Sequence, residues 1–177
     1  MRASGSRLVA GVGFAVALCI ACSNADYGAP AGSTSVDGTM TATIPGYGAW
    51  IANRTATATM ANGALTIVGE DGNFKKVTLF LIGITVGGGM TLPHVITLVP
   101  TTADTVGFAE FRERFQTGEY SYTTYNGGHG VVTISQLSAD HVTGTFDFVG
   151  SVPPFSAISP QLQSAVGGAF DLKVSAR

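Results

Sequence analysis

The sequence predicts an all-β domain, most simply a single antiparallel β-sandwich of about eight to ten strands. Apolar and polar residues alternate with a period of two from Thr39 onward, as in half-buried strands. Turn sequences such as Asn62-Gly63 separate these runs at short intervals. No segment longer than about two turns has a clear helical period. An up-and-down, lipocalin-like β-barrel would use the same pattern and is the alternative fold.

The first half of the domain reads as strands joined by tight turns. Threonine alternates with apolar residues in TMTATIP (39–45), and a PGYG turn then leads to Trp50, the only tryptophan. Alternation continues on both sides of Asn62-Gly63, in TATATM and ALTIVGE, so a hairpin is predicted there. The apolar run 77–86 has little alternation, and we expect a central strand buried on both faces.

The second half is less regular but also favours strands. GFAEFRERF (107–115) fits either a short helix or a strand, and strand is favoured because glycines bound it and its neighbours are strands. A hairpin is predicted around NGGHG (126–130), and VTGTFDF (142–148) places its aromatic residues on one face. An irregular stretch at 151–168, with three prolines, precedes a last strand at 169–177.

The N-terminal segment predicts export and a lipid anchor. Arg2 and Arg7 precede an apolar run, residues 8–20, that suits a signal peptide and is too short for a membrane-spanning helix. Cys22 follows Ala21, the small residue that a lipoprotein signal peptidase requires before the cut, so this segment resembles a lipobox. Lipidation of Cys22 is therefore predicted, with the membrane as a partner through this anchor.

Other roles of the cysteines stay open. Cys19 and Cys22 form a C-x-x-C pair, but a redox pair is expected to open a helix in a βαβ unit. A zinc site would need two further ligands. An ordinary cleaved leader is another alternative, since Cys19 stands where a lipobox usually has leucine.

The expected organisation is a signal peptide at 1–21, a flexible tether at 22–37 and one antiparallel β domain at 38–177. The tether SNADYGAPAGSTSVD is rich in small residues and lacks an apolar period, although a first irregular strand is an alternative. Once the leader is removed and Cys22 is lipidated, no free cysteine remains, so the domain is expected to fold without disulfides.

Composition argues against nucleic acid as a partner. Only 11% of residues are charged, the formal net charge is −2, and no basic stripe with interleaved aromatic residues occurs. A weakly charged surface rich in Thr, Ser, Asn and Gly is typical of exported β proteins. We expect a lipid-anchored protein of the bacterial cell envelope, in the outer membrane because Ser23 rather than Asp follows Cys22. A secreted or periplasmic protein is the alternative.

The sequence contains no recognised catalytic motif, and neither a catalytic residue nor a cofactor is predicted. The three histidines, at 94, 129 and 141, are far apart without metal-ligating spacing, so no metal site is predicted, and His129 suits an exposed hairpin tip. A hydrolase with two acidic residues is a minor alternative, but turn chemistry explains Asp71 and Asp140. The other candidates for such a pair are Asp147 and Asp171.

Aromatic residues are the candidates for ligand binding. Tyr47, Trp50, Tyr120 and Tyr122 are predicted to form a platform for a glycan or a small amphipathic ligand. Alternation places Tyr120 and Tyr122 on one face and Tyr125 on the other. An exposed shared face would favour the platform. A buried face would favour an interaction module that meets another protein through a strand edge or loop.

Three segments carry a family resemblance. They are TATIPGYGAWIA, ALTIVGEDG and GVVTISQLSADHVTGTFDF with the closing GGAFDLKV, of which the hairpin ending in Gly-Thr-Phe-x-Phe is the most specific. Together they resemble a family of small bacterial exported domains, often lipid-anchored, that is catalogued only as a domain of unknown function. Pro45 departs from the Asp or Asn that is usual before Gly46. The resemblance implies an antiparallel β fold and no catalytic residue, so we expect a non-enzymatic binding or structural role.

Overall fold

Twelve β-strands and one short 3-10 turn, η1 (Thr124–Asn126), make up the described part of the chain. The computed structural model describes residues 35–87, 90–98, 107–115, 118–152 and 162–176. The predicted signal peptide, Cys22 and most of the predicted tether lie outside these residues. The described residues all belong to one compact unit, Ser33–Arg177.

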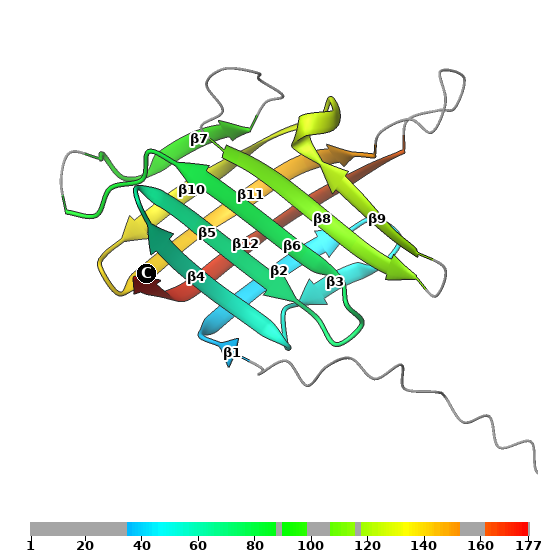
Figure 1. Cartoon of the computed structure of the whole chain (residues 1–177), viewed down its shortest axis with the longest axis horizontal. Coiled ribbons are helices and arrows are strands. Elements are labelled where there is room, and N and C mark those ends of the chain that lie inside the picture. The colour runs from blue at the N-terminus through cyan, green and yellow to red at the C-terminus, as the bar shows by residue number, and fades with distance from the viewer. Residues whose placement is uncertain (1–34, 88–89, 99–106, 116–117, 153–161, 177) are drawn as a thin grey trace, which may run out of the picture. The chain divides into compact units, whose positions relative to one another are not determined.

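The strands lie in two layers that cross each other (Figure 1). The layer toward the viewer, which we call the front layer, has the order β4-β5-β6-β8-β9, and every neighbouring pair in it is antiparallel. Its strands are β4 (Thr55–Ala61), β5 (Ala64–Glu70), β6 (Lys76–Ile82), β8 (Gly107–Phe115) and β9 (Gly118–Thr123).

The rear layer has the order β7-β10-β11-β12-β2-β3. Its strands are β2 (Gly38–Ile44), β3 (Gly48–Ile51), β7 (His94–Leu98), β10 (His129–Leu137), β11 (His141–Ser151) and β12 (Gln163–Ala176). β12 is the longest strand, with 14 residues, and it pairs along most of its length with β11.

Two long strands of the rear layer connect it to the front layer. Residues 174–176 at the end of β12 pair in parallel with β4. At another corner Ser151, the last residue of β11, pairs with Thr123 of β9. The twelve strands therefore form one continuous sheet that folds over itself, and β1 (Ser35–Val36) adds a second parallel pairing to β4.

The all-β prediction is confirmed, and several strands and turns lie where they were predicted. The segment 107–115 is a strand, and Asn62 and Gly63 take the positive φ angles, 48° and 73°, that a type I′ turn needs. The sheet has twelve strands rather than eight to ten, and its parallel pairings to β4 make it mixed rather than antiparallel. Alternation could not reveal this difference, because the same period of two suits both directions of pairing.

Two predicted details of the strands are wrong. β6 is buried on one face only, because Phe80 lies on its outer side while Val77 and Leu79 face the core. β12 begins at Gln163, inside the stretch expected to be irregular, of which residues 153–161 lie outside the described residues. Its Gly168 permits close strand contact, since a Cβ there would lie 2.0 Å from the carbonyl oxygen of Thr41.

The sheet also includes residues that precede residue 38, the predicted start of the domain. Ser35 and Val36, which the sequence assigned to the tether, pair with β4. Asp37 continues this attachment, because its N–H donates to the carbonyl oxygen of Ala56 at 2.8 Å and its own carbonyl accepts from Lys173 at 2.7 Å. The last residues of the predicted tether are thus part of the sheet.

The core fills the space between the layers. Large side chains of one layer face small residues of the other: a Cβ on Gly69 of β5 would lie 2.8 Å from the ring of Trp50 on β3. Fully burying one Leu, Ile or Phe side chain contributes about 1.5–3 kcal/mol, so this core dominates the stability of the domain. Among the described residues, no helix has the length and apolar character to cross a membrane.

Candidate functional site

The four aromatic residues predicted to form a platform do not come together on one surface. Trp50 is buried in the core, because alternation along β3 turns it inward. Tyr47 lies in the β2–β3 turn, 46% exposed, with the ammonium group of Lys75 4.4 Å from its ring centroid. Tyr120 and Tyr122 do share one face of β9, but that face points toward the core.

Four rings form what we call the inner row, on the core-facing side of β8 and β9. Phe111 stacks on Tyr122 at 5.8 Å between centroids, Tyr122 lies 6.3 Å from Tyr120, and Phe115 meets Tyr120 edge-on at 5.4 Å. Exposure rises along β8 from 1% at Phe111 to 43% at Phe115. The inner row therefore starts in the core and ends at the solvent, with Tyr120 and Tyr122 half-buried between these ends.

A carboxyl group lies within the inner row. Glu113 is on the core-facing side of β8, opposite Tyr120 in the strand register, and only 6% of it is exposed. Burial raises the pKa of its carboxyl group above the ordinary value. Burial also raises the pKa of Tyr122, and the charges of Glu113 and Tyr120 add to that effect. No role was predicted for Glu113 from the sequence, although strict alternation from Phe111 places it on the core side.

A second set of rings, the outer row, lies on the opposite side of the same layer. Phe80 of β6 and Phe108 of β8 are paired in register, with centroids 5.6 Å apart. Phe108 in turn lies 5.0 Å from Tyr125 of η1, which is 49% exposed. No role was predicted for Phe80, because it lies inside an apolar run. Its neighbours Leu79 and Leu81 face the core, so alternation places Phe80 on the outer face.

Beside the outer row, a polar network joins β8 and β9. The carboxylate of Glu110 is buried, accepts a hydrogen bond from the hydroxyl of Ser121 and pairs with Nε of Arg112 at 2.8 Å. Arg112 also contacts Glu119 at 3.4 Å. The hydrogen bond that Arg112 donates to Glu110 is the largest cause that raises the pKa of Arg112. Glu110 thus has polar partners on both strands.

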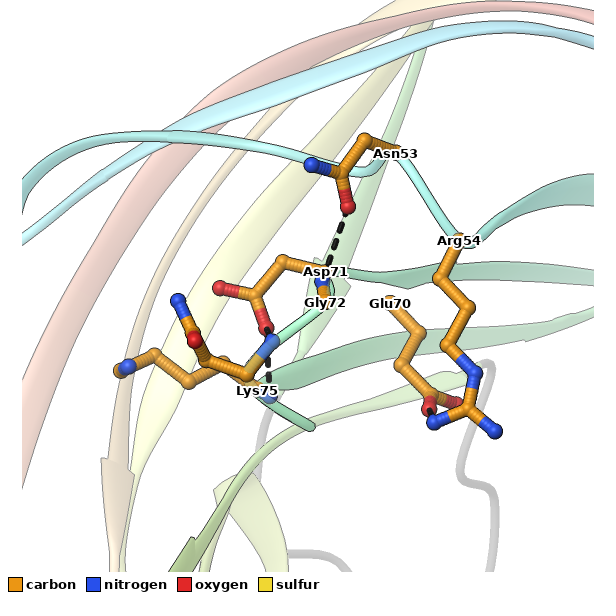
Figure 2. Close-up of polar contacts among 7 residues, drawn as sticks. Asn53, Arg54, Glu70, Asp71, Gly72 and Lys75 are labelled. Atoms are coloured by element: carbon orange, nitrogen blue, oxygen red, sulfur yellow. Dashed lines mark hydrogen bonds and ion pairs between the residues drawn. The ribbon is translucent and has the colours of Figure 1, made fainter. Parts of the chain in front are cut away.

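The β5–β6 turn is held by another set of polar contacts, drawn in Figure 2. The carboxylate of Asp71 accepts hydrogen bonds from the backbone N–H groups of Asn73 and Lys75, at 2.9 and 2.8 Å. The side-chain oxygen of Asn53 accepts from the N–H of Gly72 at 2.8 Å, which ties the β3–β4 connection to this turn. Asp71 was a candidate catalytic acid in the hydrolase alternative. Its carboxylate instead holds the turn, as its sequence context predicted.

A shallow open hollow lies over this turn. It has a volume of about 600 Å³ and polar walls from the β2–β3 and β5–β6 turns. Next to it, Arg54 pairs with Glu70 at 3.1 Å and lies over the ring of Phe74 at 4.5 Å. Because its carboxylate, Asp71, and the amide of Asn53 hold the turns, we regard the hollow as part of the scaffold.

The remaining candidate residues lie apart. Ser138 donates to Asp140 at 2.8 Å within a turn, and His141 contacts Asp171 at 2.7 Å on the surface. His129 is exposed at the start of β10. In the part of the chain that the structure describes, no three His, Cys, Asp or Glu side chains gather in a way that could hold a metal ion.

These features define a single all-β domain with a mixed two-layered sheet and aromatic rows on both faces of its front layer. The chain belongs to the family described as Domain of unknown function (DUF6252), whose model matches residues 41–168. This match confirms the resemblance to a domain of unknown function, and it includes both aromatic rows. No curated protein and no solved structure matches the chain.

Proposed function

We propose that this protein is an exported, lipid-anchored domain of the bacterial cell envelope with a non-enzymatic binding role, and that the outer row holds its ligand. The N-terminal segment supports the export and the anchor, since a short apolar run ends in small residues around Cys22. The outer membrane is the expected location. The family match adds no activity to this proposal.

The outer row is the observation that carries the binding role. Cross-strand aromatic pairs stabilise a sheet by about 0.2–1 kcal/mol, which accounts for Phe80 beside Phe108. It does not account for Tyr125, which comes from the 3-10 turn η1 and keeps about half of its surface exposed after stacking on Phe108. Three rings in series on a surface suit a ligand with apolar faces.

The surroundings of the outer row favour a glycan. On the β5 side, Thr66 is the register partner of Phe80. On β6, Thr78 lies two residues before Phe80 and so on the same face of the sheet. Sugars present apolar ring faces together with hydroxyl groups, which rings and threonine hydroxyls can bind together. A glycan or a similar amphipathic molecule is therefore the proposed ligand.

A protein partner is the second candidate, favoured by the edge strand β7. Within the described residues β7 has one hydrogen-bonded neighbour, β10, so its other edge presents unpaired backbone groups. Its outward residue Val95 is well exposed, as is Val131 on the neighbouring strand. Such an edge can accept a strand from another protein.

Binding is tested by probing an array of bacterial envelope glycans with the full-chain protein and with Tyr125→Ala and Phe108→Ala variants. The matched control is Tyr47→Ala, because Tyr47 is as exposed as Tyr125 but lies outside the outer row. We expect at least a tenfold loss of affinity, about 1.4 kcal/mol, for both outer-row variants and none for the control. Equal binding by all variants would remove the outer row as the site.

The anchor is tested separately by intact-mass spectrometry of protein extracted from membranes of its own host. We expect Cys22 as the first residue, carrying acyl chains. An unmodified chain that begins at Ser23 or Ala25 would contradict the anchor without affecting the proposed glycan site.

A further inference from the structure

Glu113 differs from Asp71 and Glu110, the other acidic residues buried in the described part of the chain, because no hydrogen bond or ion pair joins it to a described residue. Asp71 accepts two backbone hydrogen bonds, and Glu110 has both a hydroxyl donor and an arginine. Glu113 is as deeply buried, yet no hydrogen bond or ion pair joins it to another described residue. Buried charges are normally paired, because an unpaired one loses its hydration without compensation.

The nearest cation by register is engaged elsewhere. Val77 pairs with Phe111 and Lys76 with Arg112, so the register extended by one residue places Lys75 opposite Glu113. However, the ammonium group of Lys75 lies 4.4 Å from the ring centroid of Tyr47. The chain therefore places a lysine beside this carboxylate without using it as the partner.

The side chains around Glu113 suit an organic cation. Tyr120 is its cross-strand neighbour, and Tyr122 and Phe115 both lie against Tyr120. The faces of aromatic rings carry partial negative charge and attract ammonium groups, most strongly where water is excluded. A carboxylate among such rings offers a positive charge both an ion pair and apolar contact for the carbon atoms attached to it.

The core-facing side of β8 reaches the solvent at the last residue of the strand, Phe115. Along the core-facing side of β8, exposure increases from Phe111 through Glu113 to Phe115, which is well exposed. Glu113 therefore lies next to the solvent-exposed end of this face, from which a charged ligand would reach it. We propose that Glu113, Tyr120 and Tyr122 form a binding site for an organic ammonium ion on an apolar stem.

A divalent metal ion fits this site less well. Calcium takes about six to eight oxygen ligands and magnesium requires an octahedral set, whereas this place offers one carboxylate and two phenol groups. The site is distinct from the outer row, which lies on the opposite side of the front layer, so it goes beyond the proposed glycan binding and does not depend on it.

The test is an isothermal titration of the full-chain protein with n-butylammonium chloride at neutral pH, with 1-butanol as the uncharged probe of similar size. We expect saturable binding of n-butylammonium and at least tenfold weaker binding of 1-butanol. Glu113→Gln should weaken n-butylammonium binding at least tenfold. Glu119→Gln is the matched control, because Glu119 is an exposed acid on the same hairpin, and it should leave the affinity unchanged.

Three outcomes would overturn the site: no saturable binding in the millimolar range, equal binding of 1-butanol, or unchanged affinity in Glu113→Gln. A stability measurement covers the case in which that variant folds poorly. Removing an unpaired buried charge should raise Tm by about 3 °C. A fall in Tm would show that the carboxylate already has a partner within the protein, which also overturns the proposal.

Two further arms identify the source of the ammonium group and separate this site from the outer row. Tighter binding of Nα-acetyl-lysine methylamide than of n-butylammonium would assign the site to a lysine side chain of a peptide. The reverse order would assign it to a free amine. Phe108→Ala should leave n-butylammonium binding unchanged, so that failure of the glycan proposal and failure of this one can be told apart.

Discussion

The two aromatic rows share a strand, β8, but differ in what their rings do. Phe111 of the inner row is completely buried, whereas Phe108 of the outer row, three residues earlier, is only partly buried. The inner row includes a carboxyl group without a polar partner among the described residues. The acid next to the outer row, Glu110, has its hydrogen-bond and ion-pair partners.

We therefore assign a stabilising role to the buried end of the inner row and propose a role in recognition for the outer row. The inner row near Phe111 belongs to the core, and its contribution is the burial of apolar area. The outer row ends in the half-exposed ring of Tyr125, for which the proposed ligand binding would be an explanation. Glu113 is the exception on the inner side, because burial there disfavours its charged form and raises its pKa.

The largest expected effect comes from truncating the buried end of the inner row. Phe111→Ala should lower the free energy of unfolding by about 3–5 kcal/mol, because it removes a fully buried ring and leaves a cavity. Phe108→Ala on the other face of β8 is the matched variant and should cost clearly less. Urea denaturation measures both, and equal losses would contradict the division between the rows.

A smaller loss is expected when the inner row is displaced rather than truncated. A Cβ on Gly150 would lie 2.6 Å from the carbonyl oxygen of Tyr122 and 2.9 Å from its Cβ. Gly150→Ala should therefore push β9 away and cost about 1–3 kcal/mol in urea denaturation. Gly118→Ala is the control, because no atom lies within 4 Å of a Cβ there. A stable Gly150→Ala variant would show that β9 moves freely.

Replacing the carboxylate of Glu113 should raise stability, in contrast to the two substitutions above, and the gain should depend on pH. Burial raises the folded-state pKa of Glu113, so between the ordinary and the raised value the folded protein binds more protons than the unfolded chain. Stability from this group therefore falls as pH rises through that window. Lys75, Tyr120 and Tyr122 are the titratable groups beside it by register and contact.

Glu113→Gln should consequently raise Tm by about 3 °C at neutral pH, and the gain should disappear below the ordinary pKa of a glutamic acid, where both forms are neutral. Calorimetric scans from neutral to acidic pH measure this difference. A gain that is the same at every pH would mean that side-chain volume rather than charge is responsible.

The smallest stability effect is expected at the exposed end of the outer row. Tyr125→Ala should change the free energy of unfolding by no more than about 0.5 kcal/mol, as is usual for surface positions, while it weakens glycan binding. Thermal unfolding and the glycan array together measure this contrast. A loss comparable with that of Phe111→Ala would show that Tyr125 supports the fold instead.

Much of the local structure was predictable because alternation and turn chemistry act over a few residues. The Asn62-Gly63 hairpin, the strand at 107–115 and the opposite orientation of Tyr122 and Tyr125 all follow from such local rules. The candidate site was predicted less well. Trp50 and Tyr47 drew attention as conspicuous aromatic residues, whereas Phe80 and Glu113 lay in runs that looked apolar or ambiguous.

The glycines at the start of β12 show why some of the fold could not be predicted. Gly167 and Gly168 read as loop residues, yet they allow β12 to lie close to β2 and β11 at once. Nothing local to these residues indicates a strand, because the requirement comes from partners more than a hundred positions away in the case of β2.

By itself, the sequence determined the all-β class, most strand positions and which side chains share a face, because a period of two requires only neighbouring residues. It also suggested the lipid anchor at Cys22, which stays a prediction. The tertiary structure alone decided which face of each strand is buried, that β12 joins the two layers through β4, and that Glu113 lies among tyrosines. These outcomes depend on long-range pairing, and a strand's own residues do not specify the side on which its partner layer will pack.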